Sequence, residues 1–318
     1  MSGSPLSHPR VGELPLSRYD FDRDYLARTR PSLFDELAAD PATRFLLLWH
    51  GKGLLGSEDG AELALVGVDA VPAAGLWLYL GRSVSDTAHE PAGTPVVAVV
   101  LEDAAPAPVT DNQQLWGNLR TVGSTLNDRD AGLLTEAVAL ANWHSSHRFS
   151  PSTGQPLLPE LGGWVRRSPD DETAIFPRTD PAIIVLITDS DDRILLGSNA
   201  LWEANRYSLL AGFVEPGESL EAAVIREVFE ESGIRVVDPV YVGSQPWPFP
   251  ASLMVGFRAL ADPAGGWVSE PDGAEILDLR WFSRQELQDA IGEIILPGAT
   301  SIARFMIEDW FGGPVSEA

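Results

Sequence analysis

The chain has 318 residues, a length that predicts two domains rather than one, and its 44% of apolar and 21% of charged residues exclude disordered, collagen-like and coiled-coil proteins. Acidic residues outnumber basic residues by 46 to 22, and the net charge of −24 argues against long nucleic-acid footprints and against docking on anionic membranes. The sequence contains no cysteine, which excludes disulfides, thiolate zinc sites and cysteine nucleophiles.

The first half of the chain predicts a small α+β domain. Residues 1–32 are polar and Pro-rich, show no signal-peptide core, and should lie over a folded body. Strand-like apolar runs stand at 44–50, 62–68, 76–80 and 96–101, with a Gly-rich turn at 51–60. Apolar residues at helical spacing then predict a helix over 128–147. Every apolar run is far shorter than the ~20 residues that cross a bilayer, so we expect a cytoplasmic protein without a membrane partner.

The second half of the chain alternates strands with helices. Residues 149–177 come first, and their Ser, Pro, Gly and Asp content is typical of a linker. Strands are predicted at 182–187, 193–197, 208–214, 240–244, 252–261 and 277–282, and helices at 220–232 and 301–311. This order indicates an α/β arrangement. No internal repeat is visible in the sequence.

The segment 212–234, GFVEPGESLEAAVIREVFEESGI, places three carboxylates on one side of the helix predicted at 220–232. Glu227, Glu230 and Glu231 fall within an arc of about 100°, because neighbouring helical residues are about 100° apart. Such an arc is either a solvated acidic face with a salt bridge from Arg226, or a site for hard divalent cations, which prefer carboxylate oxygens together with substrate phosphates.

The spacing of Gly212, Glu218, Arg226, the three glutamates and Gly233 resembles the Nudix box without a departure. The resemblance implies a hydrolase that uses Mg²⁺ or Mn²⁺ to cleave a nucleoside diphosphate linked to another group. It implies that Glu227, Glu230, Glu231 and Arg226 are catalytic. It also implies that Glu227, Glu230, Glu231, Glu275 and the backbone carbonyl of Ala211 bind the metal.

The stretch 244–254, SQPWPFPASLM, concerns the choice of substrate. Its composition alone favours a stiff structural corner or an interface. Its pattern, however, resembles the signature of the NADH pyrophosphatase subfamily of Nudix hydrolases, and rigid aromatic rings suit stacking on a dinucleotide. The resemblance implies substrate contacts from Gln245, Pro246, Trp247, Pro248, Phe249, Pro250, Ala251, Ser252 and Ala303, with Phe176 and Phe213 as rings that stack on a base.

Many members of this subfamily carry a four-cysteine zinc ribbon, and this sequence departs from that pattern. The matching positions hold Ser150, Thr153, Ser168 and Asp171, which are not a good zinc ligand set, so we expect no zinc. Histidines 144 and 147 lie nearby and are expected to make helix-terminal or interdomain hydrogen bonds rather than to bind metal.

These observations predict an α/β protein with an N-terminal α+β domain (1–148), a degenerate zinc-ribbon-like linker (149–176) and a C-terminal Nudix fold (177–318), a mixed sheet between helices. The resemblance implies hydrolysis of NAD(H) to AMP and nicotinamide mononucleotide, removal of the NAD cap from RNA 5′ ends, and a homodimer. Two alternatives stay open. One is a broader Nudix activity on ADP-ribose or nucleotide sugars, and the other is a non-catalytic nucleotide sensor.

Overall fold

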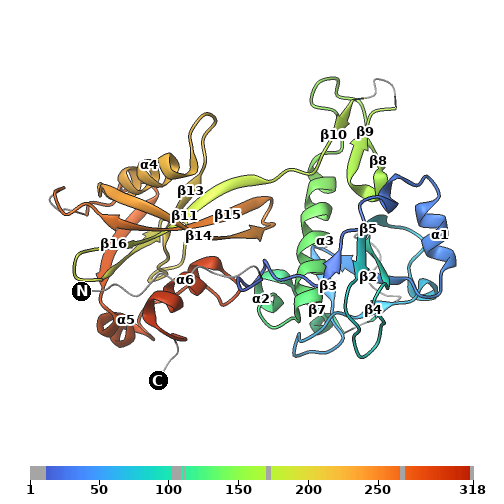
Figure 1. Ribbon diagram of the computed structural model, residues 1–318, viewed down its shortest axis with the longest axis horizontal. Helices are drawn as coiled ribbons and strands as arrows, with labels where there is room; N and C mark the ends of the chain where they lie inside the picture. Colours follow the sequence, from blue (N-terminus) through green and yellow to red (C-terminus); the bar gives the residue numbers. More distant parts are fainter. Residues whose placement is uncertain (1–11, 102–108, 111, 170–172, 266–268, 316–318) are drawn as a thin grey trace. The chain divides into compact units, whose positions relative to one another are not determined.

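The computed structural model describes residues 12–101, 109–110, 112–169, 173–265 and 269–315 (Figure 1). The chain divides into two compact units. The N-terminal unit comprises Leu16–Thr179 together with Trp247–Ala251, and the C-terminal unit comprises Met1–Pro15, Asp180–Pro246 and Ser252–Ala318. A short segment of the second half of the chain, Trp247–Ala251, therefore belongs to the first unit. The division predicted from the sequence, with boundaries at 148 and 176, stays a prediction.

The N-terminal unit contains a mixed sheet with helices on both faces. Its strands are β1 (Phe21–Asp22), β2 (Arg44–Trp49), β3 (Lys52–Leu54), β4 (Leu65–Val66), β5 (Leu76–Ser83), β6 (Pro95–Val100) and β7 (Trp116–Asn118). They pair in the order β1-β5-β6-β2-β3-β7, and β4 pairs with β2. Its helices are α1 (Leu33–Ala39), α2 (Leu119–Val122) and α3 (Asp128–Ser146), with 3-10 turns at Ala27–Thr29, Val68–Ala70, Gln113–Leu115 and Leu161–Gly163.

Alternation along the buried strands explains why both faces of this sheet are covered. In β2, Leu46 and Leu48 face a core that includes Leu134 of α3, whereas Phe45 and Leu47 face a second core that includes Leu33 of α1. Successive side chains of a strand point to opposite faces, so a continuous apolar run such as β2 needs cover on both sides. Helix α3 supplies that cover on one face along most of its length (Figure 1).

Residues 149–177 form a small sheet rather than only a linker. Strands β8 (Leu158–Glu160), β9 (Val165–Arg167) and β10 (Ala174–Ile175) pair antiparallel in the order β10-β9-β8. Trp164, which directly precedes β9, links this small sheet to β5 of the main sheet. Its indole N–H donates to the carbonyl oxygen of Tyr79 at 2.9 Å, and Arg28 stacks on its ring at 3.6 Å. The strands are only two or three residues long, so they carry no apolar run of strand length by which the sequence could reveal them.

The C-terminal unit is a second mixed sheet between helices. Its strands are β11 (Asp180–Thr188), β12 (Ile194–Asn199), β13 (Leu210–Phe213), β14 (Val236–Trp247), β15 (Ser252–Ala261) and β16 (Ile276–Phe282), and its helices are α4 (Leu220–Ser232), α5 (Arg284–Ala290) and α6 (Ile302–Phe311). The strands pair in the order β14-β15-β11-β12-β16, and β13 pairs with β11. Val224 of α4 packs under Ile183 on one face, and Met306 of α6 packs under Ile184 on the other.

The two main sheets share one pattern of pairing, which is a repeat that the sequence does not reveal. In each, a central strand (β2 or β11) runs parallel to β6 or β15, and it pairs antiparallel with a hairpin partner, β3 or β12, and with a short strand, β4 or β13. The hairpin partner pairs in turn with β7 or β16. Helix α4 follows β13, whereas only the turn Val68–Ala70 stands at the corresponding place after β4. Both sheets consist largely of apolar residues, but the residues at corresponding positions of the two sheets differ too much for the repeat to be read from the sequence.

The predicted α/β fold, with a mixed sheet between helices in the C-terminal half, is confirmed. The predicted helices agree with α3, α4 and α6 to within a residue, and the strand at 62–68 is reduced to two residues. Strand β3 lies in the predicted Gly-rich turn, and α1, α2 and α5 were not predicted because they are at most seven residues long. Among the described residues, no helix is long and apolar enough to span a membrane.

Candidate active site

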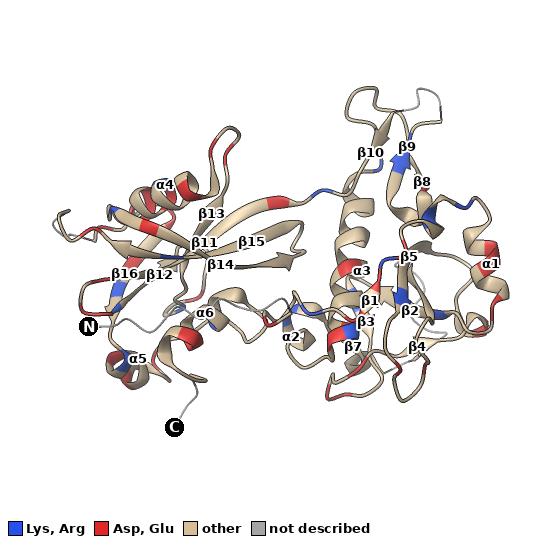
Figure 2. Cartoon of the chain, in the orientation of Figure 1, with Lys and Arg blue, Asp and Glu red and all other residues tan. Residues whose placement is uncertain are grey.

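Helix α4 presents a buried apolar side and an acidic side (Figure 2). Ser219 begins the helix, since its hydroxyl accepts a hydrogen bond from the amide of Ala222 at 3.2 Å, and Gly233 ends it in the left-handed conformation at φ 69°. Val224 and Val228 are fully buried against the sheet. Burial of this side fixes the rotation of the helix and therefore the direction in which its carboxylates point.

Arg226 joins the carboxylates of the segment into one network. Its guanidinium donates to Glu218 at 2.5 and 3.1 Å and to Glu230 at 3.0 Å, and it lies 2.9 Å from a carboxylate oxygen of Glu227. It also donates to the carbonyl of Phe213 at 3.1 Å. The hydrogen bonds from Arg226 lower the pKa of Glu218, and the same contacts raise the pKa of Arg226. One guanidinium thus contacts three carboxylates, neutralises part of their charge and ties the helix to the preceding loop.

Gly212 makes room for the carboxylate of Glu227. A Cβ atom at position 212 would lie 2.0 Å from Glu227 Cδ and 2.1 and 2.4 Å from its two oxygens. The carboxylate therefore rests directly on the backbone of β13. Burial raises the pKa of Glu227, against the opposing effect of Arg226. The glycine that opens the segment is explained by this close approach and not by its backbone conformation, because Gly212 is not among the glycines with positive φ.

Glu231 is the most buried of the three glutamates and has an unpaired oxygen. Only 5% of its surface is exposed, and its Oε2 has no hydrogen-bond partner. Burial and then the nearby charge of Glu227 raise the pKa of Glu231 to about 8, and Glu275, Asp272 and Glu230 act in the same direction. A buried carboxylate among like charges is a costly arrangement that is typical of functional sites.

Glu275 belongs to the same electrostatic neighbourhood, since its charge raises the pKa of both Glu227 and Glu231. It lies in the turn that begins at Asp272, whose carboxylate accepts hydrogen bonds from the amides of residues 274–276 at 2.7–3.2 Å. Asn199 donates to the carboxylate of Glu275 at 3.3 Å. Ala211 pairs with Ile184 in the sheet. It directly precedes Gly212, against whose backbone the carboxylate of Glu227 lies.

These residues fit a divalent cation chemically. Within the described part of the chain, no group of three His, Asp or Glu side chains could hold a metal ion as it stands. However, a cation at this place would pair with the buried oxygen of Glu231, which has no partner among the described residues, and would reduce the repulsion between the surrounding carboxylates. Carboxylate oxygens are the donors that Mg²⁺ and Mn²⁺ prefer.

The predicted substrate segment is divided between the two units. Gln245 is fully buried in the C-terminal unit, where its side-chain amide donates to the carbonyl of Thr300 at 3.0 Å. Thr300 lies next to Ser301, the residue that caps the start of α6, and the first turn of α6 contains the buried Ala303. Gln245 therefore connects the end of β14 with the beginning of α6. Pro246 and Ser252, also predicted to contact substrate, lie at the two strand ends in this unit.

Residues Trp247–Ala251 lie on the helices of the N-terminal unit. Asn142 of α3 donates to the carbonyl of Pro248 at 2.8 Å, and Arg120 of α2 stacks on the ring of Phe249 at 4.0 Å. The rings of Trp247 and Phe249 meet edge to face at 5.0 Å. The chain turns at residues 248–251, between β14 and β15, which agrees with the structural corner that the composition of this stretch favours. A role of these residues, Pro250 and Ala251 included, in substrate binding stays a prediction.

Phe213 and Phe176 have exposed rings, with 59% and 67% of their surfaces accessible, as stacking on a base would require. They belong to different units. At the predicted ribbon positions, Ser150 and Ser168 are buried and Asp171 lies outside the described residues. The hydroxyl of Ser150 accepts from the amide of Thr153 at 3.3 Å, so hydrogen bonding holds this turn.

Sequence reasoning missed Asp272 and Asn199, which hold Glu275. The Asp272–Gly273 pair is a turn signal that could have located the first, whereas nothing in the sequence relates the second to Glu275.

Comparisons with known proteins agree with both units. Residues 178–301 match the NUDIX domain, and residues 42–143 match the NADH pyrophosphatase-like rudimentary NUDIX domain. The chain is 41% identical over 284 residues to the NAD-capped RNA hydrolase NudC of Mycobacterium bovis, with 86% of this chain and 85% of that protein covered. It is 39% identical over 216 residues to NudC of Stutzerimonas stutzeri (68% and 73% covered). It is 36% identical over 199 residues to the NAD-capped RNA hydrolase NUDT12 of Homo sapiens (58% and 42% covered).

Proposed function

The chain belongs to the Nudix hydrolase family, in the group whose Nudix domain follows an NADH pyrophosphatase-like domain, and on this premise we propose that it hydrolyses the diphosphate of NAD(H) to AMP and nicotinamide mononucleotide. The same reaction at an RNA 5′ end removes an NAD cap, which is the activity named for its relatives. The observation that carries the proposal is the acidic side of α4, with Glu231 buried and unpaired beside Glu227.

The proposal assigns the metal site to Glu227, Glu230, Glu231, Glu275 and the carbonyl of Ala211, with Mg²⁺ or Mn²⁺ as the cation. When bound, the cation neutralises charge on the diphosphate and lowers the pKa of a coordinated water. Arg226 keeps Glu227 and Glu230 in place through its contacts at 2.9 and 3.0 Å. One of the box carboxylates accepts the proton of the attacking water.

Substrate choice is assigned to the segment that begins at Gln245 and to the start of α6. The buried hydrogen bond from Gln245 to Thr300 fixes these two stretches against each other, which supports a preformed recognition surface. The exposed rings of Phe213 and Phe176 are candidates for stacking on the two bases. The net charge of −24 supports recognition of the capped end rather than of the RNA that follows it.

The direct test compares NADH, NAD⁺, NAD-capped RNA and ADP-ribose as substrates of the purified full chain with Mg²⁺ or Mn²⁺. We expect kcat/KM to be higher for the three NAD compounds than for ADP-ribose. The variant Glu231→Gln should lose at least about 10²-fold in kcat, the usual scale for a group that acts on the reacting water. Glu221→Gln, on the exposed side of the same helix, is the matched control and should keep full activity.

Two results would contradict the proposal. Faster hydrolysis of ADP-ribose would favour a broader Nudix activity. Tight binding of NADH without hydrolysis would favour a nucleotide sensor.

We also propose a homodimer that acts in the cytoplasm. Support for the dimer comes from the resemblance and from Trp247, a residue type that is enriched at the centres of interfaces. Light scattering should give about twice the 34.3 kDa of one chain. A fully active monomer at micromolar concentration would contradict the dimer.

A further inference from the structure

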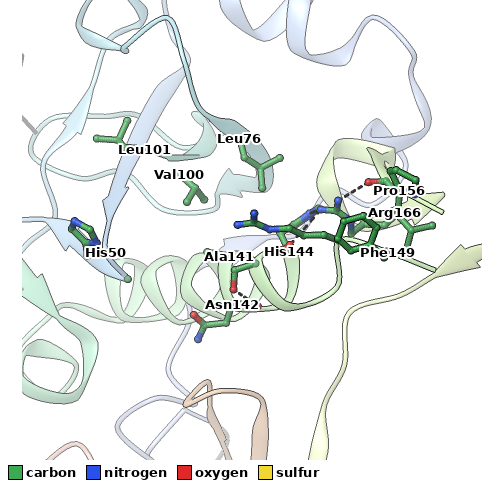
Figure 3. A pocket seen from close by; sticks show the side chains of 14 residues that line it. His50, Leu76, Val100, Leu101, Ala141, Asn142, His144, Phe149, Pro156 and Arg166 are labelled. Atoms are coloured by element: carbon green, nitrogen blue, oxygen red, sulfur yellow. Dashed lines mark hydrogen bonds between the residues drawn. The ribbon is translucent and has the colours of Figure 1, made fainter. Parts of the chain in front are cut away.

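A pocket of about 860 Å³ lies within the N-terminal unit, and none of its lining residues belongs to the Nudix box (Figure 3). Leu76, Val100 and Leu101 line it from the sheet, and Ala141 and His144 line it from α3. Pockets of roughly 300–1,000 Å³ with a mainly apolar lining are typical of sites for small molecules. The size and composition of this pocket therefore suit a small organic ligand.

The charge of the pocket is opposite to that of the chain. Its described lining contains Arg148 and Arg166 but no Asp or Glu, although acidic residues outnumber basic ones two to one in the sequence. None of the ion pairs between described residues involves either arginine. Such a local excess of positive charge attracts anions.

Among the described residues, the buried cation Arg166 is held by neutral groups. It is 8% exposed, its guanidinium donates to His144 Nδ1 at 2.8 Å and to the carbonyl of Leu157 at 2.5 Å, and its Nε has no partner in the described part of the chain. Buried charges are costly unless they are paired with an opposite charge, so a bound anion would stabilise Arg166.

His144 does not supply a negative charge. Its Nδ1 accepts from Arg166, so its proton is on Nε2, which donates to the carbonyl of Gly163 at 2.8 Å. Burial lowers the pKa of His144 to about 4, and the ring is therefore neutral near pH 7. The histidine orients the guanidinium without offsetting its charge. Figure 3 shows both residues at one end of the pocket, close to Phe149 and Pro156.

We infer that this pocket is a second ligand site, which binds a mononucleotide or a similar aromatic phosphomonoester by placing the phosphate between Arg148 and Arg166 and the base against Phe149. The ring of Phe149 is 61% exposed and offers a face for stacking. Arginine is suited to phosphate because its planar guanidinium can donate two parallel hydrogen bonds. The site is separate from the one that the proposed hydrolysis uses.

The test is calorimetric titration of the full chain with 5′-AMP, adenosine and inorganic phosphate, in EDTA so that metal-dependent binding at the box is removed. We expect 5′-AMP to bind at least about tenfold more tightly than either adenosine or phosphate, since each contributes only half of the contacts. Arg148→Ala should weaken 5′-AMP binding by about tenfold or more and leave NADH hydrolysis unchanged. Arg148 is exposed, and its side chain makes no hydrogen bond or ion pair with another described residue, so this variant should remain folded, whereas Arg166→Ala risks unfolding.

Arg167→Ala is the matched control, because Arg167 stands on the same strand as Arg166, pairs with Glu160 at 2.8 Å and does not line the pocket. It should bind 5′-AMP like the wild type, and so should Glu231→Gln. Wild-type affinity in Arg148→Ala, or equal affinities for 5′-AMP and adenosine, would overturn the inference. Loss of binding in Glu231→Gln alone would place the nucleotide at the Nudix box instead. Absence of binding up to about 1 mM would also overturn it.

Discussion

Replacing Gly212 by alanine tests whether the position of Glu227 controls the reaction. The added Cβ would lie 2.0 Å from the carboxyl carbon of Glu227, whereas an ordinary contact begins near 3.4 Å. The carboxylate must therefore move by about 1.4 Å or rotate away, and it would lose its 2.9 Å contact with Arg226. The backbone at 212 has no positive φ, so alanine adds no conformational strain there.

The expected loss follows from this displacement. A misplacement of about 1 Å in a catalytic arrangement costs on the order of 10²-fold in rate, so we expect Gly212→Ala to lose at least that much in kcat for NADH. The fold should persist, because Arg226 keeps its bonds to Glu218 and Glu230, and the apolar side of α4 is untouched. The free energy of unfolding should therefore change by no more than about 0.5 kcal/mol, the range of ordinary surface substitutions.

The assay is the initial rate of AMP release from NADH at saturating Mn²⁺, with thermal unfolding of the same preparation. Gly313→Ala is the control, since a Cβ at 313 meets nothing within 4 Å. It should match the wild type in both measurements. Activity of Gly212→Ala within about threefold of wild type would refute the reasoning, because it would show that the site tolerates displacement of Glu227.

Three further predictions concern stability, metal and substrate choice. Glu136 of α3 is buried, and its carboxylate lies 2.5 Å from the guanidinium of Arg23. Burial raises the pKa of Glu136 to about 7, above its ordinary 4.5, although the charges of Arg23 and Arg28 act in the opposite direction. The stabilising contribution of the protonated carboxyl is therefore complete at low pH and is lost as the pH rises through 7. Glu136→Gln should raise the unfolding temperature relative to wild type at pH 8 but not at pH 5, and equal differences at both would count against this. Purified protein should contain less than stoichiometric zinc by mass spectrometry, and EDTA should abolish activity without unfolding the chain until Mg²⁺ or Mn²⁺ restores it; one tightly held zinc per chain would contradict the prediction. Trp247→Ala and Gln245→Ala should reduce kcat/KM for NADH more than for ADP-ribose, and parallel losses on both substrates would support a purely structural role.

The sequence predicted helix α4 well because its signals are local. Ser219, the apolar side with Val224 and Val228, and Gly233 mark the beginning, rotation and end of α4, and the structure has the helix with these bounds. The carboxylates then face one side as a geometric consequence of their spacing.

Features that depend on distant partners were not predictable in this way. The raised pKa of Glu231 depends in part on the charge of Asp272, some 40 residues further along the chain. The placement of Trp247 on α2 depends on Arg120, and that of Pro248 on α3 depends on Asn142; both partners are more than 100 residues away in sequence. The three short strands in 149–177 carry no apolar run, so only their pairing reveals them.

The position of Arg226 among Glu218, Glu227 and Glu230 affects the order of events in a newly made molecule. A helix that brought its own carboxylates together without a cation would have to wait for metal before it could fold. Here the guanidinium of Arg226 already pairs with these carboxylates, so the packing of α4 on the sheet does not require a metal ion. Folding and metal binding are thereby separable, and a metal-free chain should keep its fold while it lacks activity.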